Sequence, residues 1–244
     1  MNKPDNISLN DWRLLERKYV NLDPILKKLN QGYPIQYLIG DVDFYGHQIL
    51  VNENVLIPRF ETETLVEKTL KYVDKLGLEK ASVLEIGTGS GCISISLKGN
   101  LPNLEITAID ISRKALNLAK KNARLNKTKI NFILKDLFRL NLINNYDILI
   151  SNPPYLIKGE KIDEKTKYEP EIALYADKTG LNYYVKIFDV AKEVLNQKFL
   201  IALEIDEDRA TDVKKIALKN FPKSKIKIEK DLNQKNRYIF VYSE

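Results

Sequence analysis

From residue 82 to the C-terminus, short runs of β-branched and aliphatic residues alternate with longer stretches of helical periodicity. The strand-like runs lie at residues 83–86, 104–109, 130–134, 146–150, 199–204, 225–229 and 237–242. Strands that alternate with helix-length segments predict βαβ units and a parallel sheet with helices on both faces. We therefore expect an α/β fold with a doubly wound, seven-stranded, Rossmann-like sheet that binds its ligands at the carboxyl ends of the strands.

A glycine-rich segment follows the first of these strands. Residues 85–91 read Glu-Ile-Gly-Thr-Gly-Ser-Gly, and an apolar helix start comes next. Glycines at this point let backbone N–H groups approach a ligand at the helix N-terminus. The spacing departs from the dinucleotide fingerprint Gly-x-Gly-x-x-Gly, and Glu85 would repel a pyrophosphate. The segment therefore favours a cationic ligand.

Asp110 ends the second strand-like run, about twenty residues after the glycine loop. A carboxylate at this place can accept hydrogen bonds from both hydroxyls of a ribose. The glycine loop and Asp110 together predict a nucleoside ligand that carries positive charge.

The fourth strand-like run ends in Asn152-Pro153-Pro154-Tyr155. Each proline fixes φ and lacks an N–H, so the amide of Asn152 is held on a stiff backbone. This amide can grip another planar NH2 group, and Tyr155 offers an aromatic face for it. The tetrapeptide alone fits a proline-rich turn equally well. Its position after the glycine loop and Asp110 favours the functional interpretation.

At these residues the chain resembles the S-adenosylmethionine-dependent class I methyltransferases, and within them the protein-glutamine N5-methyltransferases that modify peptide chain release factors. The resemblance extends over residues 33–205 and includes residues 36–40, 44–46, 56–63, 135–138, 168–170, 173–174 and 180–181. The run Ile-Pro-Arg-x-Glu-Thr-Glu at 57–63 discriminates best, because Asn-Pro-Pro-Tyr also occurs in DNA adenine and RNA guanine methyltransferases.

The resemblance implies S-adenosyl-L-methionine as the cofactor. Its methionyl part would be wrapped by the loop residues Gly87, Thr88, Gly89, Ser90 and Gly91. Glu85 would lie near the ammonium group and Asp110 would hold the ribose. Asp136 would accept from the adenine amino group, and Leu137 would cover one adenine face. Many relatives carry an aromatic residue at the position of Leu137, so we expect weaker stacking here. Both aspartates would also suit helix N-caps or turns.

The resemblance also implies the chemistry. The oxygen of Asn152 and the backbone carbonyl of Pro153 would each accept one N–H of the substrate glutamine, and Tyr155 would pack against its amide. Asn152 would also border the cofactor, and Pro154 would belong to the substrate side. The expected partner is the Gly-Gly-Gln loop of a peptide chain release factor.

Arg59, Glu61 and Glu63 allow two interpretations. They could line the cleft and hold the substrate, or Thr62 could cap a helix whose positive N-terminus the two glutamates favour. Glu169 and Pro170, after the charged stretch at residues 158–167, could belong to a lid over the substrate.

The chain is expected to have three parts. Residues 1–32 form a short helical segment, with a capping box at Ser8 and Asp11 and a second helix that starts at Asp23-Pro24. Residues 33–58 form a hairpin linker with strands at 37–44 and 48–51. Residues 59–244 form the catalytic domain, which begins with a helix over 61–76 that Gly77 ends. Relatives typically carry more helices before the hairpin, and they have glycine at the position of Asp206.

Composition narrows the classes of function. The chain has 44% hydrophobic and 30% charged residues, as globular proteins do. No apolar run reaches the ~18 residues of a membrane span, so we expect a cytoplasmic protein. With His47 as its single histidine, we expect neither a metal site nor a histidine-based triad. A formal charge of +6 permits an anionic partner, but we expect a monomer with no stable nucleic-acid partner.

Three other functions use the same residues. A glutamine methyltransferase of a ribosomal protein would share the whole site. An RNA or DNA amino-methyltransferase would use the same clamp on a base, with Tyr155 stacked on it. A non-catalytic nucleoside-binding protein could share the fold. Labelled S-adenosylmethionine offered with separate pools of release factor, ribosomal protein, tRNA and DNA would discriminate among them.

Overall fold

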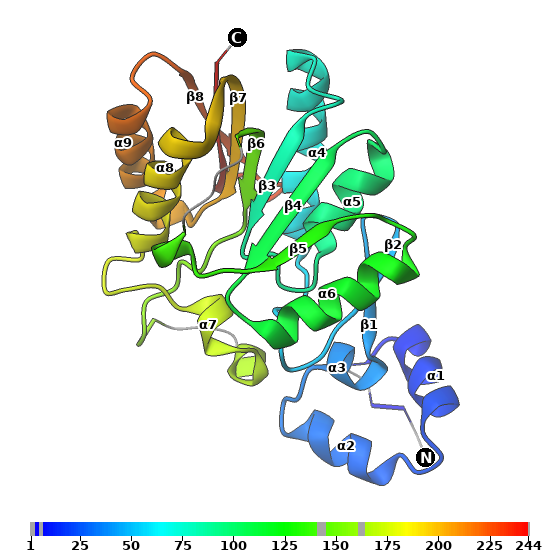
Figure 1. Ribbon diagram of the computed structural model, residues 1–244. Coiled ribbons are helices and arrows are strands. Elements are labelled where there is room, and N and C mark those ends of the chain that lie inside the picture. The colour runs from blue at the N-terminus through cyan, green and yellow to red at the C-terminus, as the bar shows by residue number, and fades with distance from the viewer. Residues whose placement is uncertain (1–2, 5–6, 141–144, 161–163, 244) are drawn as a thin grey trace.

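The computed structural model describes residues 3–4, 7–140, 145–160 and 164–243, and it is built around one seven-stranded sheet (Figure 1). The strand order is β5-β4-β3-β6-β7-β9-β8. The strands are β3 (Ser82–Ile86), β4 (Glu105–Asp110), β5 (Asn131–Leu134), β6 (Tyr146–Ser151), β7 (Leu195–Glu204), β8 (Lys225–Lys230) and β9 (Asn236–Tyr242). Each of the seven strands expected after residue 82 is therefore confirmed, close to its expected bounds.

One strand departs from the expected parallel arrangement. β9 runs antiparallel to both β7 and β8, whereas β3 to β7 pair in parallel. The reason is the connection from β8 to β9, which spans only residues 231–235 and leaves no room for a crossover helix. Asp231 closes this turn by accepting hydrogen bonds from the backbone N–H groups of Asn233 and Lys235.

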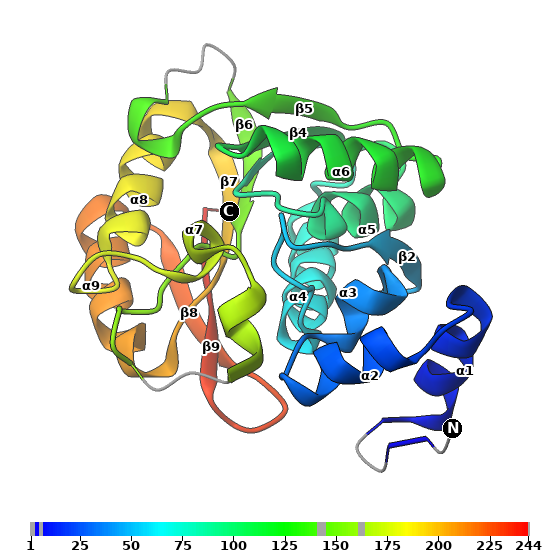
Figure 2. The same cartoon turned by 90° about the horizontal axis from the view of Figure 1, so that it is seen from below.

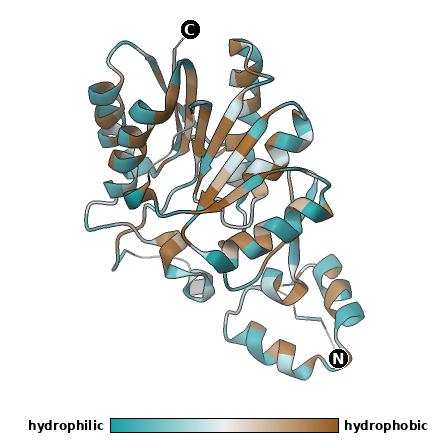
Figure 3. Ribbon diagram, in the orientation of Figure 1, coloured by the Kyte–Doolittle hydropathy of each residue, from teal (hydrophilic) through white to brown (hydrophobic). Residues whose placement is uncertain are grey.

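Helices cover both faces of the sheet (Figure 2). On one face lie α4 (Phe60–Leu76), α5 (Cys92–Asn100) and α6 (Arg113–Leu125), and on the other lie α8 (Asn182–Val194) and α9 (Ala210–Asn220). Successive strand residues point to opposite faces, so Val83 packs with the first group of helices and Leu84 with the second. Hydrophobic residues accordingly line the sheet, while the outer surfaces of the helices are largely hydrophilic (Figure 3).

The hairpin linker is shorter than the sequence suggested. The expected strand over residues 37–44 is wrong in its first part, because α3 (Ile35–Ile39) forms there. Pro34 stands at the N-cap of this helix, and Gly40 ends it at a φ of 96°, which glycine adopts readily. The hairpin itself consists of β1 (Asp41–Phe44) and β2 (His47–Leu50).

The N-terminal helices α1 (Leu9–Lys18) and α2 (Asp23–Asn30) pack together with α3. Leu15, Ile25 and Leu38, one from each helix, form a small cluster separate from the two sheet cores. The capping box is confirmed, because the backbone N–H of Asp11 donates to Ser8 Oγ at 3.0 Å. The remaining elements are α7 (Glu171–Leu174) and the 3-10 turns η1 (Leu137–Arg139), η2 (Glu164–Tyr168) and η3 (Glu207–Arg209).

Asn122, on α6, links the hairpin to the glycine loop. Its buried side chain exchanges two hydrogen bonds with the backbone of Leu50, at 2.8 and 3.0 Å, and donates a third to the carbonyl of Ser90 in the glycine loop. The side-chain amide of Asn122 thus holds the linker, α6 and the glycine loop together. Within the described ranges, none of the helices is long and apolar enough to cross a membrane.

Candidate active site

The glycine loop lies at the carboxyl end of β3, as expected. Gly87, Gly89 and Gly91 all have positive φ, at 71°, 54° and 84°, a conformation that other residues rarely adopt. A Cβ at Gly91 would also lie 3.2 Å from the Cβ of Ala119, so this glycine lets α5 and α6 approach. Gly87 and Gly89 line the main cavity of the site. The loop therefore presents backbone to a ligand at two of its three glycines.

Glu85 lies beneath this loop. Its Oε2 accepts hydrogen bonds from the hydroxyls of Thr88, at 2.8 Å, and Ser94, while its buried Oε1 has no hydrogen-bond partner in the described part of the chain. Burial raises the pKa of this carboxyl to about 7. When it is ionised, this carboxylate favours the binding of a positively charged ligand group at the loop above it. Glu85, Thr88 and Ser90 are outside the residues that line the cavity.

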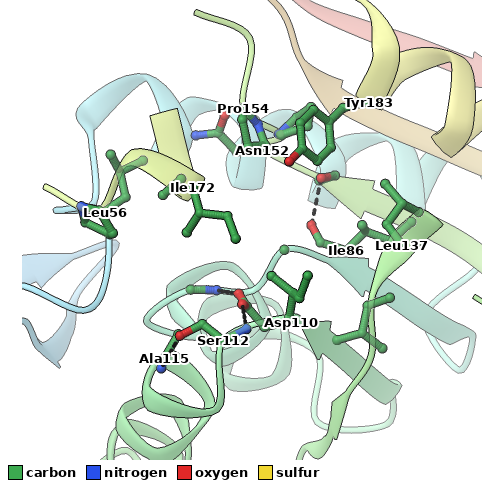
Figure 4. Close-up of a pocket in the computed structure, with 18 of the residues that line it drawn as sticks. Leu56, Ile86, Asp110, Ser112, Ala115, Leu137, Asn152, Pro154, Ile172 and Tyr183 are labelled. Carbon is green, nitrogen blue, oxygen red and sulfur yellow. Dashed lines mark hydrogen bonds between the residues drawn. The ribbon is translucent and has the colours of Figure 1, made fainter. Parts of the chain in front are cut away.

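Asp110 stands at the end of β4 and faces the same cavity. Its Oδ2 accepts the N–H of Gly89 and its Oδ1 accepts the N–H of Ser112, both at 2.8 Å. Burial raises its pKa, and these N–H donors oppose that shift. Each carboxylate oxygen can accept a second hydrogen bond, so the side chain is positioned for a diol. Figure 4 shows Asp110 and Ser112 on one side of the cavity, facing Asn152 and Tyr183.

The main cavity has a volume of about 260 Å³ and lies across the carboxyl ends of β3, β4 and β6. Asp136 lines it and accepts the N–H of Phe138, so it also fills the role of a turn aspartate. Leu137 is buried beside it and also lines the cavity. Tyr183, which the sequence did not single out, enters from the start of α8 and packs edge-on against Phe138, with 5.3 Å between ring centroids. Two aromatic rings thus accompany Leu137.

The Asn-Pro-Pro-Tyr run forms the wall between this cavity and a smaller one. The smaller cavity, of about 130 Å³, is lined by Tyr155, Arg59 and Glu204 and shares Asn152, Pro153 and Pro154 with the first. Ser151 Oγ donates to the carbonyl of Ile86 at 2.7 Å, which fixes the end of β6 against the end of β3. Asn152 therefore borders a larger chamber on one side and a smaller chamber on the other.

The amide of Asn152 belongs to a short series of hydrogen bonds that leads to the buried Glu204. Its Nδ2 donates to Thr62 Oγ1 at 3.0 Å, and the Thr62 hydroxyl donates to Glu204 Oε2 at 2.8 Å. Of the two interpretations, the one in which Thr62 caps the helix is wrong, because the N-cap of α4 is Arg59 and it makes no side-chain cap. Neither Thr62 nor Glu204 could be assigned from the sequence, because their contact joins residues far apart in the chain.

The three charged residues before α4 separate in the structure. Arg59 lines the smaller cavity and pairs with the buried Glu169 at 2.5 Å. Glu63 lies against the β1–β2 turn, where it accepts a backbone hydrogen bond from Tyr45. Glu61 and Glu63 are absent from the lining of both cavities. Of the stretch at 158–167, residues 161–163 lie outside the described residues, whereas Pro170 lines the main cavity.

Comparisons with known proteins agree with this geometry. Residues 61–172 match the methyltransferase small domain family. The release factor glutamine methyltransferase of Flavobacterium psychrophilum is 40% identical over 98% of this chain and 82% of its own length. The enzyme of the same name from Lactococcus lactis is 37% identical over 99% of this chain and 89% of its own.

Solved structures show the fold. A methyltransferase from Pyrococcus furiosus matches with a TM-score of 0.59 and 18% identity, over 81% of this chain and 89% of that one. A T. thermophilus 16S rRNA methyltransferase, solved with AdoMet and guanosine, also has a TM-score of 0.59, with 15% identity over 84% of this chain and 50% of that one. The sheet is therefore that of the class I S-adenosylmethionine-dependent methyltransferases, and from its relatives at 37–40% identity over nearly its full length the chain belongs to the release factor glutamine methyltransferase family.

Proposed function

We propose that this protein transfers a methyl group from S-adenosyl-L-methionine to the side-chain amide nitrogen (N5) of the glutamine in the Gly-Gly-Gln motif of a peptide chain release factor. The observation that carries the proposal is the orientation of the Asn152 amide. Its NH2 group is bound by Thr62 Oγ1, and in the described part of the chain its oxygen has no donor. That oxygen is therefore available to a substrate N–H.

The residues of the main cavity fit the cofactor. The carboxylate of Glu85 beneath the glycine loop suits a cationic group, and Asp110 suits the two hydroxyls of a ribose. Leu137 and Tyr183, which line the same cavity, offer apolar and aromatic surface for a purine. When bound, the cofactor supplies a methyl group that its positively charged sulfur has already activated.

We expect the affinity for S-adenosylmethionine to rise several-fold between pH 6 and pH 7.5. Burial raises the pKa of Glu85 to about 7, so the carboxyl is mostly neutral at pH 6 and mostly ionised at pH 7.5. A cation binds the ionised form better, so affinity increases with pH through this window. Calorimetric titrations of the wild type and Glu85→Gln test this expectation, because the variant should show a much weaker pH dependence. If the affinity changed equally with pH in both proteins, the expectation would be contradicted.

At the wall between the cavities, the chain's own groups prepare the nucleophile. A glutamine amide nitrogen is a weak nucleophile because its lone pair is delocalised into the carbonyl. If Asn152 Oδ1 and the carbonyl of Pro153 each accept one of its N–H groups, they hold the nitrogen in place and stabilise the positive charge that grows on it. Tyr155 lines the smaller cavity together with Asn152 and Pro153. The nitrogen, once alkylated, releases its proton to water, so none of these groups has to act as a base.

A release factor is the substrate that the relatives' name indicates. Such a substrate belongs to the translation apparatus, so we place the enzyme in the cytoplasm. The smaller cavity, of about 130 Å³, gives the side-chain amide of a glutamine a place beside Asn152 and Tyr155.

Mass spectrometry tests the proposal directly. A release factor incubated with the enzyme and S-adenosylmethionine should gain one methyl group on the glutamine of its Gly-Gly-Gln motif. A substrate with asparagine at that position is the matched control and should stay unmodified, because its shorter side chain holds the nitrogen more than an ångström away. Parallel incubations with ribosomal proteins, tRNA and DNA should remain unlabelled. Methyl transfer to one of those pools instead would refute the proposed substrate.

A further inference from the structure

Two buried side chains and the partly buried Asn152, from distant parts of the chain, form a hydrogen-bonded series beside the smaller cavity. Glu204 comes from the end of β7, Thr62 from the first turn of α4, and Asn152 from the loop after β6. Thr62 and Glu204 are 3% and 2% exposed, so water does not compete for their hydrogen bonds. The two links measure 2.8 Å from Thr62 to Glu204 and 3.0 Å from Asn152 to Thr62.

The direction of these bonds follows from the chemistry of their ends. An ionised carboxylate only accepts hydrogen bonds, so the single hydroxyl proton of Thr62 is committed to Glu204. Thr62 Oγ1 can then only accept from its other neighbour. The amide of Asn152 must therefore turn its NH2 group toward Thr62, and its oxygen is left to face the substrate.

We propose that Glu204, acting through Thr62, is a positioning residue that fixes the orientation of the Asn152 amide. The assignment rests on the proposed methylation of an amide nitrogen, for which Asn152 has to present an acceptor. Without a carboxylate at 204, the hydroxyl of Thr62 is free to donate to Asn152 Oδ1. The amide then turns around, and its NH2 group meets the NH2 group of the substrate, where both are donors.

The surroundings of Glu204 support this role over that of a structural ion pair. In the described part of the chain no cationic side chain lies within ion-pair distance of Glu204. A buried carboxylate without such a partner is costly, and among the described residues its one side-chain hydrogen bond comes from Thr62. The site can tolerate this energetic cost if the carboxylate is needed as a group that only accepts hydrogen bonds.

The charge state of Glu204 gives the proposal a pH dependence. Burial raises the pKa of this carboxyl to about 7. The ionisable groups that face it are Arg59 and Glu61 at the start of α4, Tyr155 after β6, Tyr184 on α8, and Arg237 and Tyr238 on β9. When Glu204 is protonated it can donate to Thr62, and the directional constraint is lost. At saturating cofactor, kcat should therefore rise between pH 6 and pH 8.

The first experiment compares Glu204→Gln and Glu204→Leu with wild type, and with Glu193→Gln as the control, because Glu193 is an exposed glutamate on α8. We expect Glu204→Leu to lower kcat five- to tenfold and Glu204→Gln to lower it less, because a glutamine can still accept from Thr62. The affinity for S-adenosylmethionine, measured by calorimetry, should not change in either.

The pH dependence of kcat should disappear in Glu204→Gln. Thr62→Ser should keep the wild-type rate, whereas Thr62→Val should resemble Glu204→Leu.

A double-mutant cycle separates positioning from other roles of Glu204, which also borders the smaller cavity and could touch the substrate itself. If Glu204 acts through Asn152, Glu204→Leu should cause no further loss of single-turnover rate in an Asn152→Ala background. An equal loss in both backgrounds would overturn the positioning role and point to direct contact or to general damage. Wild-type enzyme that binds S-adenosylmethionine but modifies no release factor would instead overturn the proposed function. The two failures are thus distinguishable.

Discussion

Asn152→Ala should lower kcat for release factor methylation by about a hundredfold or more, while the affinity for S-adenosylmethionine changes far less. The substitution removes the acceptor that holds the substrate nitrogen and that gains strength as positive charge develops there. Loss of one such group in a preorganised site typically costs two to three orders of magnitude in rate. Asn152 is one of many residues that line the cofactor cavity, so cofactor binding should largely persist.

Single-turnover assays with labelled cofactor would measure the rate, and calorimetry would measure the affinity. Asn117→Ala is a suitable control, because Asn117 is an exposed amide on α6 and its replacement leaves the site untouched. The protein-glutamine mechanism would be wrong if the Asn152 variant retained full turnover. A variant that lost cofactor binding and activity together would instead show that Asn152 serves the cofactor.

The parts of the site that the sequence predicted are those with local signals. The Gly-x-Gly-x-Gly spacing requires backbone that only glycine adopts readily, and all three glycines do have positive φ. Asp110 and Asn152 each follow an apolar run, and parallel strands bring such positions to one edge of the sheet. β3 and β4 are parallel neighbours, so the loop after β3 lies next to the end of β4, and the N–H of Gly89 donates to Asp110.

The parts that the sequence missed depend on tertiary contacts. Tyr183 lies on a helix from the second half of the chain, and nothing in its local pattern distinguishes it from Tyr184, which is buried in the core. We expected weaker adenine stacking because position 137 holds a leucine. The rings of Phe138 and Tyr183 line the same cavity and can supply the aromatic surface that Leu137 lacks. The link between Thr62 and Glu204 joins residues more than a hundred positions apart. Local periodicity carries no information about such a pair.

The helix over residues 35–39 was missed for a different reason. Its residues Ile35, Tyr37 and Ile39 alternate with other residues in a way that favours a strand by propensity. Burial of Leu38 against Leu15 and Ile25 stabilises the helical form instead. A five-residue helix has little intrinsic stability, so tertiary packing decided between the two structures.

Asp110→Ala should weaken S-adenosylmethionine binding at least tenfold. The carboxylate is placed to accept two ribose hydroxyls, and hydrogen bonds to a charged acceptor contribute about 1.5 to 3 kcal/mol each. Their joint loss of about 3 kcal/mol or more corresponds to about a hundredfold in the dissociation constant. Asp110 also holds the N–H groups of Gly89 and Ser112, so some of the loss could come from a displaced loop.

Asp110→Asn separates these two contributions, because an asparagine oxygen can still accept one of the two N–H groups while the charge and the second acceptor are lost. If the ribose contacts dominate, Asp110→Asn should lose nearly as much affinity as Asp110→Ala while its thermal unfolding temperature stays closer to that of the wild type. Asp74→Ala, at an exposed aspartate of α4, controls for the loss of one negative charge. Calorimetric titration that found unchanged affinity in a folded Asp110→Ala protein would refute the ribose assignment, and with it the orientation of the cofactor between the glycine loop and Tyr183.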